Sequence, residues 1–323
     1  MGDPAGIGPE TIIKAFQGRK LETICRILVI GDMRFLVSVA SLIGTPLSIN
    51  SIQKLDEAKY QSGLLDVLDL QNVPENLPTG KATENGGKAC LDYIRTAVKL
   101  AMENKVDAIT TGPINKKSIR LAGYDYSGHT ELLAELTKTN DFALMMIGKR
   151  LRVALVTLHI SLKKVAISLN ISLIEKTISL TYDWLVRYVK SKPKIAVTGL
   201  NPHCGDSEIF GKEETLFIEP AIRNCCLKGL DVEGPFPADS FFVPKRHSKF
   251  DAVVAMYHDQ GLIPIKMESE GCAVNLTLGL PIIRTSVDHG TAYDIVNKGI
   301  ASSDSLINAV RTAAKLSICL PAS

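Results

Sequence analysis

Short apolar runs alternate with longer stretches of helical periodicity along most of the chain. The runs are rich in β-branched residues and end on turn residues, as buried strands of parallel sheets do. We expect strands at residues 27–32, 107–113, 194–201 and 251–258, and a strand pair within 142–158 that turns at Gly148–Lys149. We expect helices at residues 33–43, 86–105, 171–189, 211–230 and 303–317. The alternation predicts an α/β fold with a mostly parallel sheet.

The segment GDPAGIGPE (residues 2–10) has the composition of a turn that leads from a strand into a helix. Glycines allow the bend, Pro9 suits the first helical position, and Glu10 suits the first turn. No strand precedes this turn, because the sequence begins at Met1. We expect the missing first strand to lie upstream of Met1, and the alternative is a turn at a sheet edge that has no such strand.

The amino-acid composition excludes several classes of protein. The chain of 323 residues is 46% hydrophobic and 22% charged, which excludes a wholly disordered chain. Lys and Arg total 37 against 34 for Asp and Glu, and no dense basic cluster indicates nucleic acid or an anionic membrane as partner. The apolar runs are too short to span a membrane, and the first residues lack the features of a signal peptide. Seven cysteines without a CxxC pair favour reduced thiols, so we expect a cytoplasmic globular protein.

Three histidines end or follow expected strands: His159, His203 and His258. Ligands of open α/β sheets bind at the carboxyl ends of the strands, so these side chains are candidates for one site. Three imidazoles with an open position suit zinc or a similar divalent ion. The alternative is that each is an ordinary polar residue at a strand end. Cys204, beside His203, is interpreted as a small packing residue.

His129 and Thr130 begin an expected helix, where free backbone N–H groups favour an anion. The alternative is helix capping alone, by Ser127 or Thr130.

The carboxy-terminal third carries Lys266, Asn275 and Arg284 near expected strand ends. Two cations and an amide suit a small substrate that bears a phosphate and a carboxylate. The alternative is surface charge on loops.

Two further segments are candidates for contacts with a ligand. In DHGTAYD, Gly290 lets the backbone approach a ligand closely, while Asp288, His289 and Thr291 offer polar groups. Asp239 follows two prolines in GPFPADSFF, where its carboxylate suits a general base or a group that orients one. A local turn bond is the alternative for Asp239. The dinucleotide GxGxxG, Walker and GxSxG patterns do not occur.

The motifs closely resemble those of the 4-hydroxythreonine-4-phosphate dehydrogenase family of pyridoxal-phosphate biosynthesis. They occur in order along nearly the whole chain: GDPAGIGPE, TTGPINK, GHTELLAE, LNPHCGDSE, GPFPADSFF, AMYHDQGLIPIK and VNLTLGLPIIRTSVDHGTAYD. The resemblance implies two α/β/α domains with mostly parallel sheets, similar to isocitrate and isopropylmalate dehydrogenases, with the active-site cleft between them. It implies a cofactor-side domain of residues 1–124 with 290–323, and a domain of residues 125–289 for metal, substrate and dimerisation.

The resemblance also implies an activity. NAD or NADP oxidises the C3 hydroxyl of 4-phosphooxy-L-threonine, and the keto acid loses CO₂ to give 3-amino-2-oxopropyl phosphate in vitamin B6 biosynthesis. The implied partner is a second copy, in a homodimer with the active site at the subunit interface and some ligands from the partner. The implied residues are His159, His203 and His258 for a zinc, magnesium or cobalt ion; His129, Thr130, Lys266, Asn275 and Arg284 for substrate; and Asp288, His289, Gly290 and Thr291 for the cofactor. Asp239 is our hypothesis for the catalytic base.

Three alternatives stay open. The first is a paralogous dehydrogenase of 4-phosphorylated threonate or erythronate, whose substrate carries a hydroxyl in place of the amine. The second is a phosphate acyltransferase-like enzyme, which needs neither metal nor nicotinamide. The third is a non-catalytic sensor of a phosphorylated metabolite.

Overall fold

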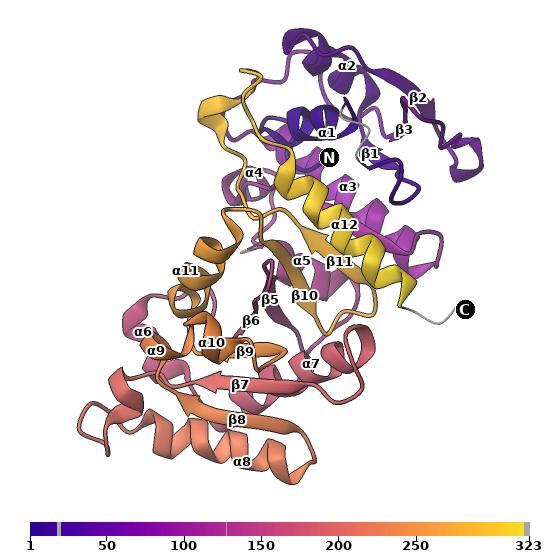
Figure 1. The fold of residues 1–323 in the computed structure, drawn as a ribbon. Coiled ribbons are helices and arrows are strands. Elements are labelled where there is room, and N and C mark those ends of the chain that lie inside the picture. The colour runs from indigo at the N-terminus through magenta and orange to yellow at the C-terminus, as the bar shows by residue number, and fades with distance from the viewer. Residues whose placement is uncertain (18–20, 127, 320–323) are drawn as a thin grey trace. The chain divides into compact units, whose positions relative to one another are not determined.

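The computed structural model describes residues 1–17, 21–126 and 128–319, which divide into two compact units. The first unit consists of Met1–Lys138 and Leu280–Ile318. The second unit consists of Thr139–Gly279 together with Cys319. The chain therefore leaves the first unit, builds the second, and returns (Figure 1).

The strands of the first unit are parallel. They are β1 (Val29–Gly31), β2 (Ser48–Ile52), β3 (Leu64–Asp69), β4 (Ala108–Thr111) and β11 (Ile283–Ser286). β3 lies between β1 and β2, and Val67 pairs with Val29 on one side and Ser51 on the other. β4 pairs with β11, with Ile109 opposite Arg284.

Side-chain caps begin several helices of this unit. The helices are α1 (Gly8–Gln17), α2 (Met33–Leu42), α3 (Glu84–Met102), α4 (Lys116–Leu121), α5 (His129–Leu136) and α12 (Asp304–Ile318), with short 3₁₀ turns at Leu55–Glu57 and Tyr293–Ile295. The carboxylate of Asp32 accepts from the first turn of α2, and Thr83 does the same for α3. Asn115 accepts from two N–H groups of α4. Each cap satisfies N–H groups that a helix start leaves without an internal partner.

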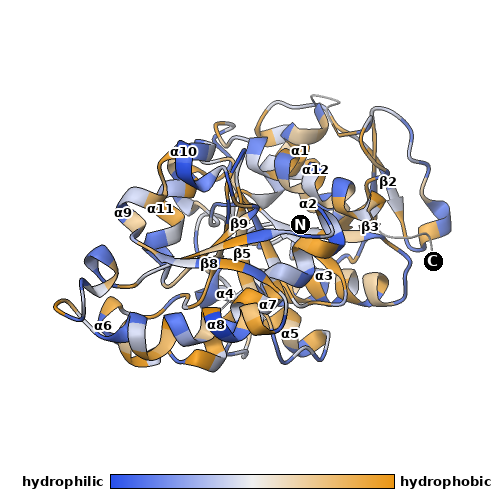
Figure 2. Cartoon of the chain, turned by 60° about the horizontal axis from the view of Figure 1, so that its bottom comes forward, coloured by the Kyte–Doolittle hydropathy of each residue, from blue (hydrophilic) through white to orange (hydrophobic). Residues whose placement is uncertain are grey.

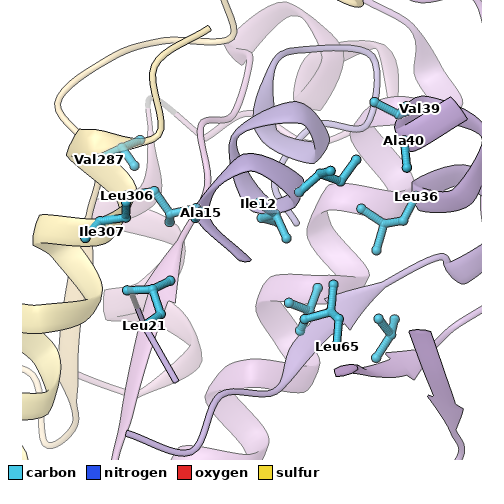
Figure 3. Packing of buried hydrophobic residues seen from close by; sticks show 13 residues of the cluster. Ile12, Ala15, Leu21, Leu36, Val39, Ala40, Leu65, Val287, Leu306 and Ile307 are labelled. Atoms are coloured by element: carbon cyan, nitrogen blue, oxygen red, sulfur yellow. The ribbon is translucent and has the colours of Figure 1, made fainter. Parts of the chain in front are cut away.

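Apolar side chains from several segments form the core beside α1. Figure 3 shows Leu306 and Ile307 of α12 near Ala15, with Leu36 of α2 beyond Ile12. These side chains are all nearly inaccessible to solvent. The core thus joins residues from both stretches of chain that make up this unit.

The second unit contains one sheet of mixed direction. Its strands lie in the order β10 (Val274–Leu278), β5 (Ala143–Ile147), β6 (Arg152–Leu155), β9 (Ala252–Ala255), β7 (Lys194–Thr198) and β8 (Asp231–Phe236). β5 is antiparallel to both neighbours, and the pairs from β6 to β8 are parallel. The parallel strands β6, β7 and β9 are apolar and buried, as strands covered on both faces are.

Helices pack against this sheet and around its strand ends. They are α6 (Leu162–Ser168), α7 (Ile171–Tyr188), α8 (Glu219–Leu227), α9 (Ala238–Phe241), α10 (Pro244–His247) and α11 (His258–Ser269), with a 3₁₀ turn η2 (Pro202–Gly205) and a π turn (Glu214–Ile218). α7 contacts β5, β6 and β9, and α11 contacts β5, β6 and β9. Figure 2 shows hydrophobic and hydrophilic residues alternating along α8. This pattern is typical of a helix that buries one face and exposes the other.

The α/β fold with mostly parallel sheets is confirmed, and each predicted strand or helix range contains an element of that kind, although several bounds differ. Two placements were wrong. His258 does not end a strand but begins α11, because β9 stops at Ala255. Lys266 lies within α11 rather than near a strand end. No helix of the described ranges is long and apolar enough to cross a membrane.

Candidate active site

Two of the three candidate metal ligands are neighbours in the second unit. Beyond the ends of β6 and β9 the two segments stay together, because the N–H and the hydroxyl of Thr157 both donate to the carbonyl of Met256, at 3.1 and 2.8 Å. The ring centroids of His159 and His258 lie 5.6 Å apart. The structure therefore brings these two imidazoles together at the carboxyl ends of adjacent parallel strands.

The surroundings of His258 suit a metal ligand. Its Nδ1 lies 2.7 Å from Oδ1 of Asp259. A neutral imidazole that donates from Nδ1 keeps its lone pair on Nε2, and metal-bound histidines commonly have such a carboxylate partner. Among the side chains that the structure describes, however, no three His, Cys, Asp or Glu residues of one chain form a group able to hold an ion. His203 is thus not brought to the other two within one chain.

His203 lies in a loop that is held in an uncommon conformation. It occupies η2 after β7, and all residues from 203 to 208 have positive φ values. Residues other than glycine rarely adopt positive φ values unless the surrounding structure holds the backbone in that conformation. The buried carboxylate of Glu214 provides such a hold, since it accepts the N–H groups of Leu200 and Asn201, both at 2.7 Å. The sequence reasoning did not identify Glu214.

Gln260 is a second residue that the sequence reasoning missed. Its buried amide accepts the N–H of Met256 at 2.7 Å and the hydroxyl of Thr198 at 2.8 Å. Its Nε2 donates to the carbonyl of Gly199 at 2.7 Å. Gln260 therefore links the end of β7, which leads to His203, with the end of β9, which leads to His258.

Asp239 lies near the loop of His203. It is exposed on α9, and α9 packs against η2. Burial first, then the charge of Glu214 and more weakly that of Asp239, raise the pKa of the Cys204 thiol to about 11. The thiol is therefore protonated at neutral pH, and its sulfur packs against Gly199, which agrees with a packing role for Cys204.

A buried cation on β11 of the first unit reaches the last residue of β4. Arg284 is only 2% exposed, and its Nη2 and Nε donate to the hydroxyl of Thr111 at 2.8 and 3.2 Å. Burial lowers the pKa of this guanidinium to about 9, so it keeps its charge at neutral pH. A buried charge gains most from an anionic partner, which makes Arg284 suitable for holding a phosphate or carboxylate.

His129 lies close enough to Arg284 for the guanidinium charge to affect the pKa of the imidazole. Burial, and next the charge of Arg284, lower the pKa of His129 well below 6.5, whereas a hydrogen bond with the backbone of Gly112 acts in the opposite direction. The imidazole is therefore neutral at pH 7. Its buried Nε2 has no hydrogen-bond partner among the described residues. A buried polar atom of this kind fits a site that a ligand completes.

The remaining predicted substrate residues are dispersed. Thr130 follows His129 in the first turn of α5, whose N-cap, Gly128, makes no side-chain cap, while Ser127 is outside the described residues. Lys266 is exposed on α11 of the second unit, and Asn275 lies in β10, opposite Met146.

The four candidate cofactor residues share one loop after β11. The N–H of Asp288 donates to the hydroxyl of Ser305 at 3.0 Å, and the carbonyl of Thr291 accepts the N–H of Ile7, also at 3.0 Å. Nδ1 of His289 lies 3.0 Å from the carbonyl of Gly290. The amino-terminal loop thus holds this segment by its backbone.

A buried carboxylate supports the same loop. Oδ2 of Asp3 accepts the hydroxyls of Ser118 and Tyr293, both at 2.7 Å. Asp3 is fully buried, and its own N–H donates to the carbonyl of Pro113. The sequence marks GDPAGIGPE and DHGTAYD as two separate motifs. Nothing in either motif shows that they contact each other, so this contact could not be predicted.

These mostly parallel sheets, with polar groups at the ends of several strands, are those of an α/β enzyme. The profile of the family described as "Pyridoxal phosphate biosynthetic protein PdxA" matches residues 23–313, and the chain belongs to this family.

Relatives within the family carry two names. The chain is 48% identical over 316 residues to a 4-hydroxythreonine-4-phosphate dehydrogenase from Desulforapulum autotrophicum, which covers 97% of this chain and 93% of the relative. It is 45% identical over 317 residues to a D-threonate 4-phosphate dehydrogenase from Cupriavidus necator, which covers 98% and 95%. The crystal structure of a 4-hydroxythreonine-4-phosphate dehydrogenase from Klebsiella pneumoniae superposes with a TM-score of 0.89, at 40% identity over 98% of both chains. The chain is therefore an oxidoreductase of the dehydrogenase type.

Proposed function

We propose that this chain uses NAD or NADP to oxidise 4-phosphooxy-L-threonine at C3, and that the resulting keto acid decarboxylates to 3-amino-2-oxopropyl phosphate in vitamin B6 biosynthesis. The observation that carries the proposal is the 48% identity, over 97% of the chain, to a 4-hydroxythreonine-4-phosphate dehydrogenase. The grouping of Arg284 with His129 supports an anionic substrate.

Arg284 and the first turn of α5 bind the charged groups of the substrate. The guanidinium is fixed by Thr111, so little side-chain entropy is lost when an anion binds. Neutral His129 is available to hydrogen-bond an oxygen of the substrate, because its Nε2 has no protein partner among the described residues. Thr130 follows in the same turn. Lys266 and Asn275, in the second unit, supply a further cation and an amide.

His159, His203 and His258 would hold a divalent ion, with zinc, magnesium and cobalt as the candidates. Such an ion supplies a Lewis acid that lowers the pKa of a substrate hydroxyl. Two of these imidazoles are adjacent in one chain, and Asp259 orients one of them. A homodimer with a site at the subunit interface completes the ligand set from a second copy, which agrees with the absence of a three-residue group among the described residues of one chain.

The oxidation moves a hydride and a proton to different acceptors. A bound nicotinamide would supply the acceptor for the C3 hydride, and the hydroxyl proton would pass to a base, for which we propose Asp239 or a group that it orients. The carboxylate of Asp239 is exposed near the loop of His203, so it is accessible to a substrate. Loss of CO₂ from the keto acid follows, and a proton then replaces it.

The loop of Asp288, His289, Gly290 and Thr291 binds the cofactor. Its backbone is fixed by the amino-terminal loop, and Gly290 has open space where a side chain would lie. We propose that the first unit carries this loop and Arg284, and that the second unit carries the metal ligands. A cytoplasmic location fits the seven cysteines, none of which is in a disulfide among the described residues.

A dehydrogenase of D-threonate 4-phosphate is the second candidate, because a relative of that name is 45% identical over 98% of the chain. The two substrates differ in an amine or a hydroxyl at C2, and a site built to pair one group can reject the other. The test measures NADH and NADPH formation with both phosphates, at equal enzyme and saturating cofactor. A kcat/KM at least about tenfold higher for 4-phosphooxy-L-threonine supports the first function. Turnover of D-threonate 4-phosphate alone would replace it with the second.

A further inference from the structure

An irregular segment of residues 287–303 joins β11 to α12 in the first unit (Figure 1). Apart from the 3₁₀ turn at Tyr293–Ile295, these residues form no helix or strand. Irregular segments of this length are uncommon in compact domains and often carry function. The four candidate cofactor residues, Asp288–Thr291, lie near its start. The contacts that hold this β11–α12 segment in shape therefore bear on how the cofactor binds.

Residues of the GDPAGIGPE motif hold the start of the β11–α12 segment. The N–H of Ile7 donates to the carbonyl of Thr291 at 3.0 Å. The hydroxyl of Tyr293 donates to Oδ2 of Asp3 at 2.7 Å. Between these two contacts Ala292 has a φ of 40°, in the left-handed region, which a residue with a side chain keeps only where its surroundings hold it. The motif provides this hold on both sides of Ala292.

Gly6 approaches Thr291 so closely that a side chain would not fit between them. A Cβ atom on Gly6 would lie 2.8 Å from Cβ and 2.9 Å from the carbonyl oxygen of Thr291. Non-bonded carbon atoms ordinarily lie about 3.5–4.0 Å apart, so a methyl group on Gly6 would displace Thr291. Thr291 is buried and its carbonyl is bonded to Ile7, so it makes room only by moving the β11–α12 segment.

Two charged residues of α1 hold the end of the β11–α12 segment. Nζ of Lys14 donates to the carbonyls of Gly299 and Ala301, at 2.6 and 2.8 Å. Oε1 of Glu10 accepts the N–H of Ala301 at 2.9 Å and lies 3.3 Å from Nζ of Lys14. The side chain of Glu10 is only 1% exposed, and hydrogen bonds that involve an ionised group are stronger than neutral ones. One ammonium and one carboxylate therefore fix the backbone where the segment approaches α12.

We propose that Gly6, Glu10 and Lys14 position the cofactor-binding residues and thereby set the affinity of the chain for the nicotinamide cofactor. This inference rests on the proposed function, in which Asp288–Thr291 bind that cofactor. The three residues act through the backbone, because they hold the β11–α12 segment at both ends. A loop that is already held in its bound shape loses less conformational freedom when the ligand binds. Loosening either end therefore weakens cofactor binding.

The substrate site should not respond to the same changes. Arg284 lies on β11, ahead of the segment, and its guanidinium donates to the hydroxyl of Thr111 on β4 at 2.8 Å. This hydrogen bond involves no residue of the GDPAGIGPE motif or of α1. A loss of cofactor affinity at constant substrate KM thus separates the positioning role from a general loss of stability.

The test measures the dissociation constants for NADH and NADPH on the chain of 323 residues, from the fluorescence of the bound nicotinamide. Lys14→Met keeps the aliphatic stem and removes the donors to Gly299 and Ala301, so it should weaken binding about fivefold or more. Lys14→Arg keeps the charge and the donors and should restore most of the affinity. Gly6→Ala adds only a methyl group at the other end of the segment and should also weaken binding.

Lys88→Met is the matched control. Lys88 also forms an ion pair with a glutamate four residues earlier, Glu84, but on the exposed surface of α3. Its loss should leave the affinity for both cofactors unchanged. Unchanged affinity in Lys14→Met and Gly6→Ala would overturn the proposal whatever their melting temperatures, and so would an equal loss of affinity in Lys88→Met.

His289→Ala distinguishes failure of this inference from failure of the proposed function. If His289→Ala weakens cofactor binding and Lys14→Met does not, the segment binds the cofactor without the positioning role, and only the inference fails. If neither variant weakens cofactor binding, the segment does not bind the cofactor, and the cofactor assignment of the proposed function fails as well.

Discussion

Gln260 offers a direct test of how the fold positions the histidines. Its side chain makes three hydrogen bonds, two of them to the backbone at the ends of β7 and β9. Gln260→Leu keeps most of the volume but removes every polar atom, and leaves the N–H of Met256 and the carbonyl of Gly199 buried without this partner. Gln260→Glu keeps the oxygen that accepts from Met256 and loses the donor to Gly199.

The expected loss of stability follows from these contacts. A neutral hydrogen bond contributes about 1 kcal/mol, and a buried group left without a partner costs about 1–3 kcal/mol. We therefore expect Gln260→Leu to lower the free energy of unfolding by about 3–5 kcal/mol, and Gln260→Glu by less. Loss of a group that orients metal ligands commonly weakens metal binding about 10–100-fold, and we expect this for Gln260→Leu.

The assay measures the melting temperature and the dissociation constant for Zn²⁺ of the same purified samples. Thr181→Val is the matched control, because its hydroxyl is also buried in the second unit and donates to the carbonyl of Thr177 in α7. The control should lose about 1 kcal/mol of stability and keep the Zn²⁺ affinity. An unchanged Zn²⁺ affinity in Gln260→Leu, at reduced stability, would refute the positioning role.

Three further variants test other parts of the account. Arg284→Ala should raise the KM for the phosphorylated substrate about 10–100-fold and the cofactor KM much less, because a charge-assisted bond is lost; equal effects on both would contradict this. Tyr293→Phe removes the hydroxyl that donates to Asp3, so steady-state kinetics should show a severalfold rise in cofactor KM at constant substrate KM. Below pH 6.5 the unfolded chain takes up a proton at His129 and the folded chain does not, so stability falls as pH falls from 7 to 5. His129→Asn should reduce this fall in melting temperature, and an unaltered fall would contradict the burial of a neutral imidazole.

The apolar runs predicted the strands well because the central strands are covered on both faces. The start of α11 was harder to predict, since the apolar run of β9 continues through Met256 to Tyr257 without a turn residue. In the structure the side-chain oxygen of Gln260 accepts a hydrogen bond from the N–H of Met256, and the strand pairing of β9 ends before this residue. α11 also contains Gly261 and Pro264, which give little sign of a helix in sequence.

The candidate site depended on sheet order, which periodicity does not reveal. His159 and His258 are adjacent because β6 pairs with β9, although many other elements separate them along the chain. Glu214 and Gln260 were missed because an isolated polar residue in a helical pattern normally faces solvent. Only the fold shows that both are buried and that both bind backbone groups near the histidines.

The central claim is that His159, His203 and His258 hold one divalent ion. Anomalous diffraction from crystals grown with Zn²⁺, recorded on both sides of the zinc absorption edge, tests it most directly. The account predicts one strong peak per protomer, within about 2.0–2.1 Å of three imidazole nitrogens, with any ligand from a second copy included. A peak bound elsewhere, or a metal-loaded crystal in which the three rings surround no common ion, would contradict it.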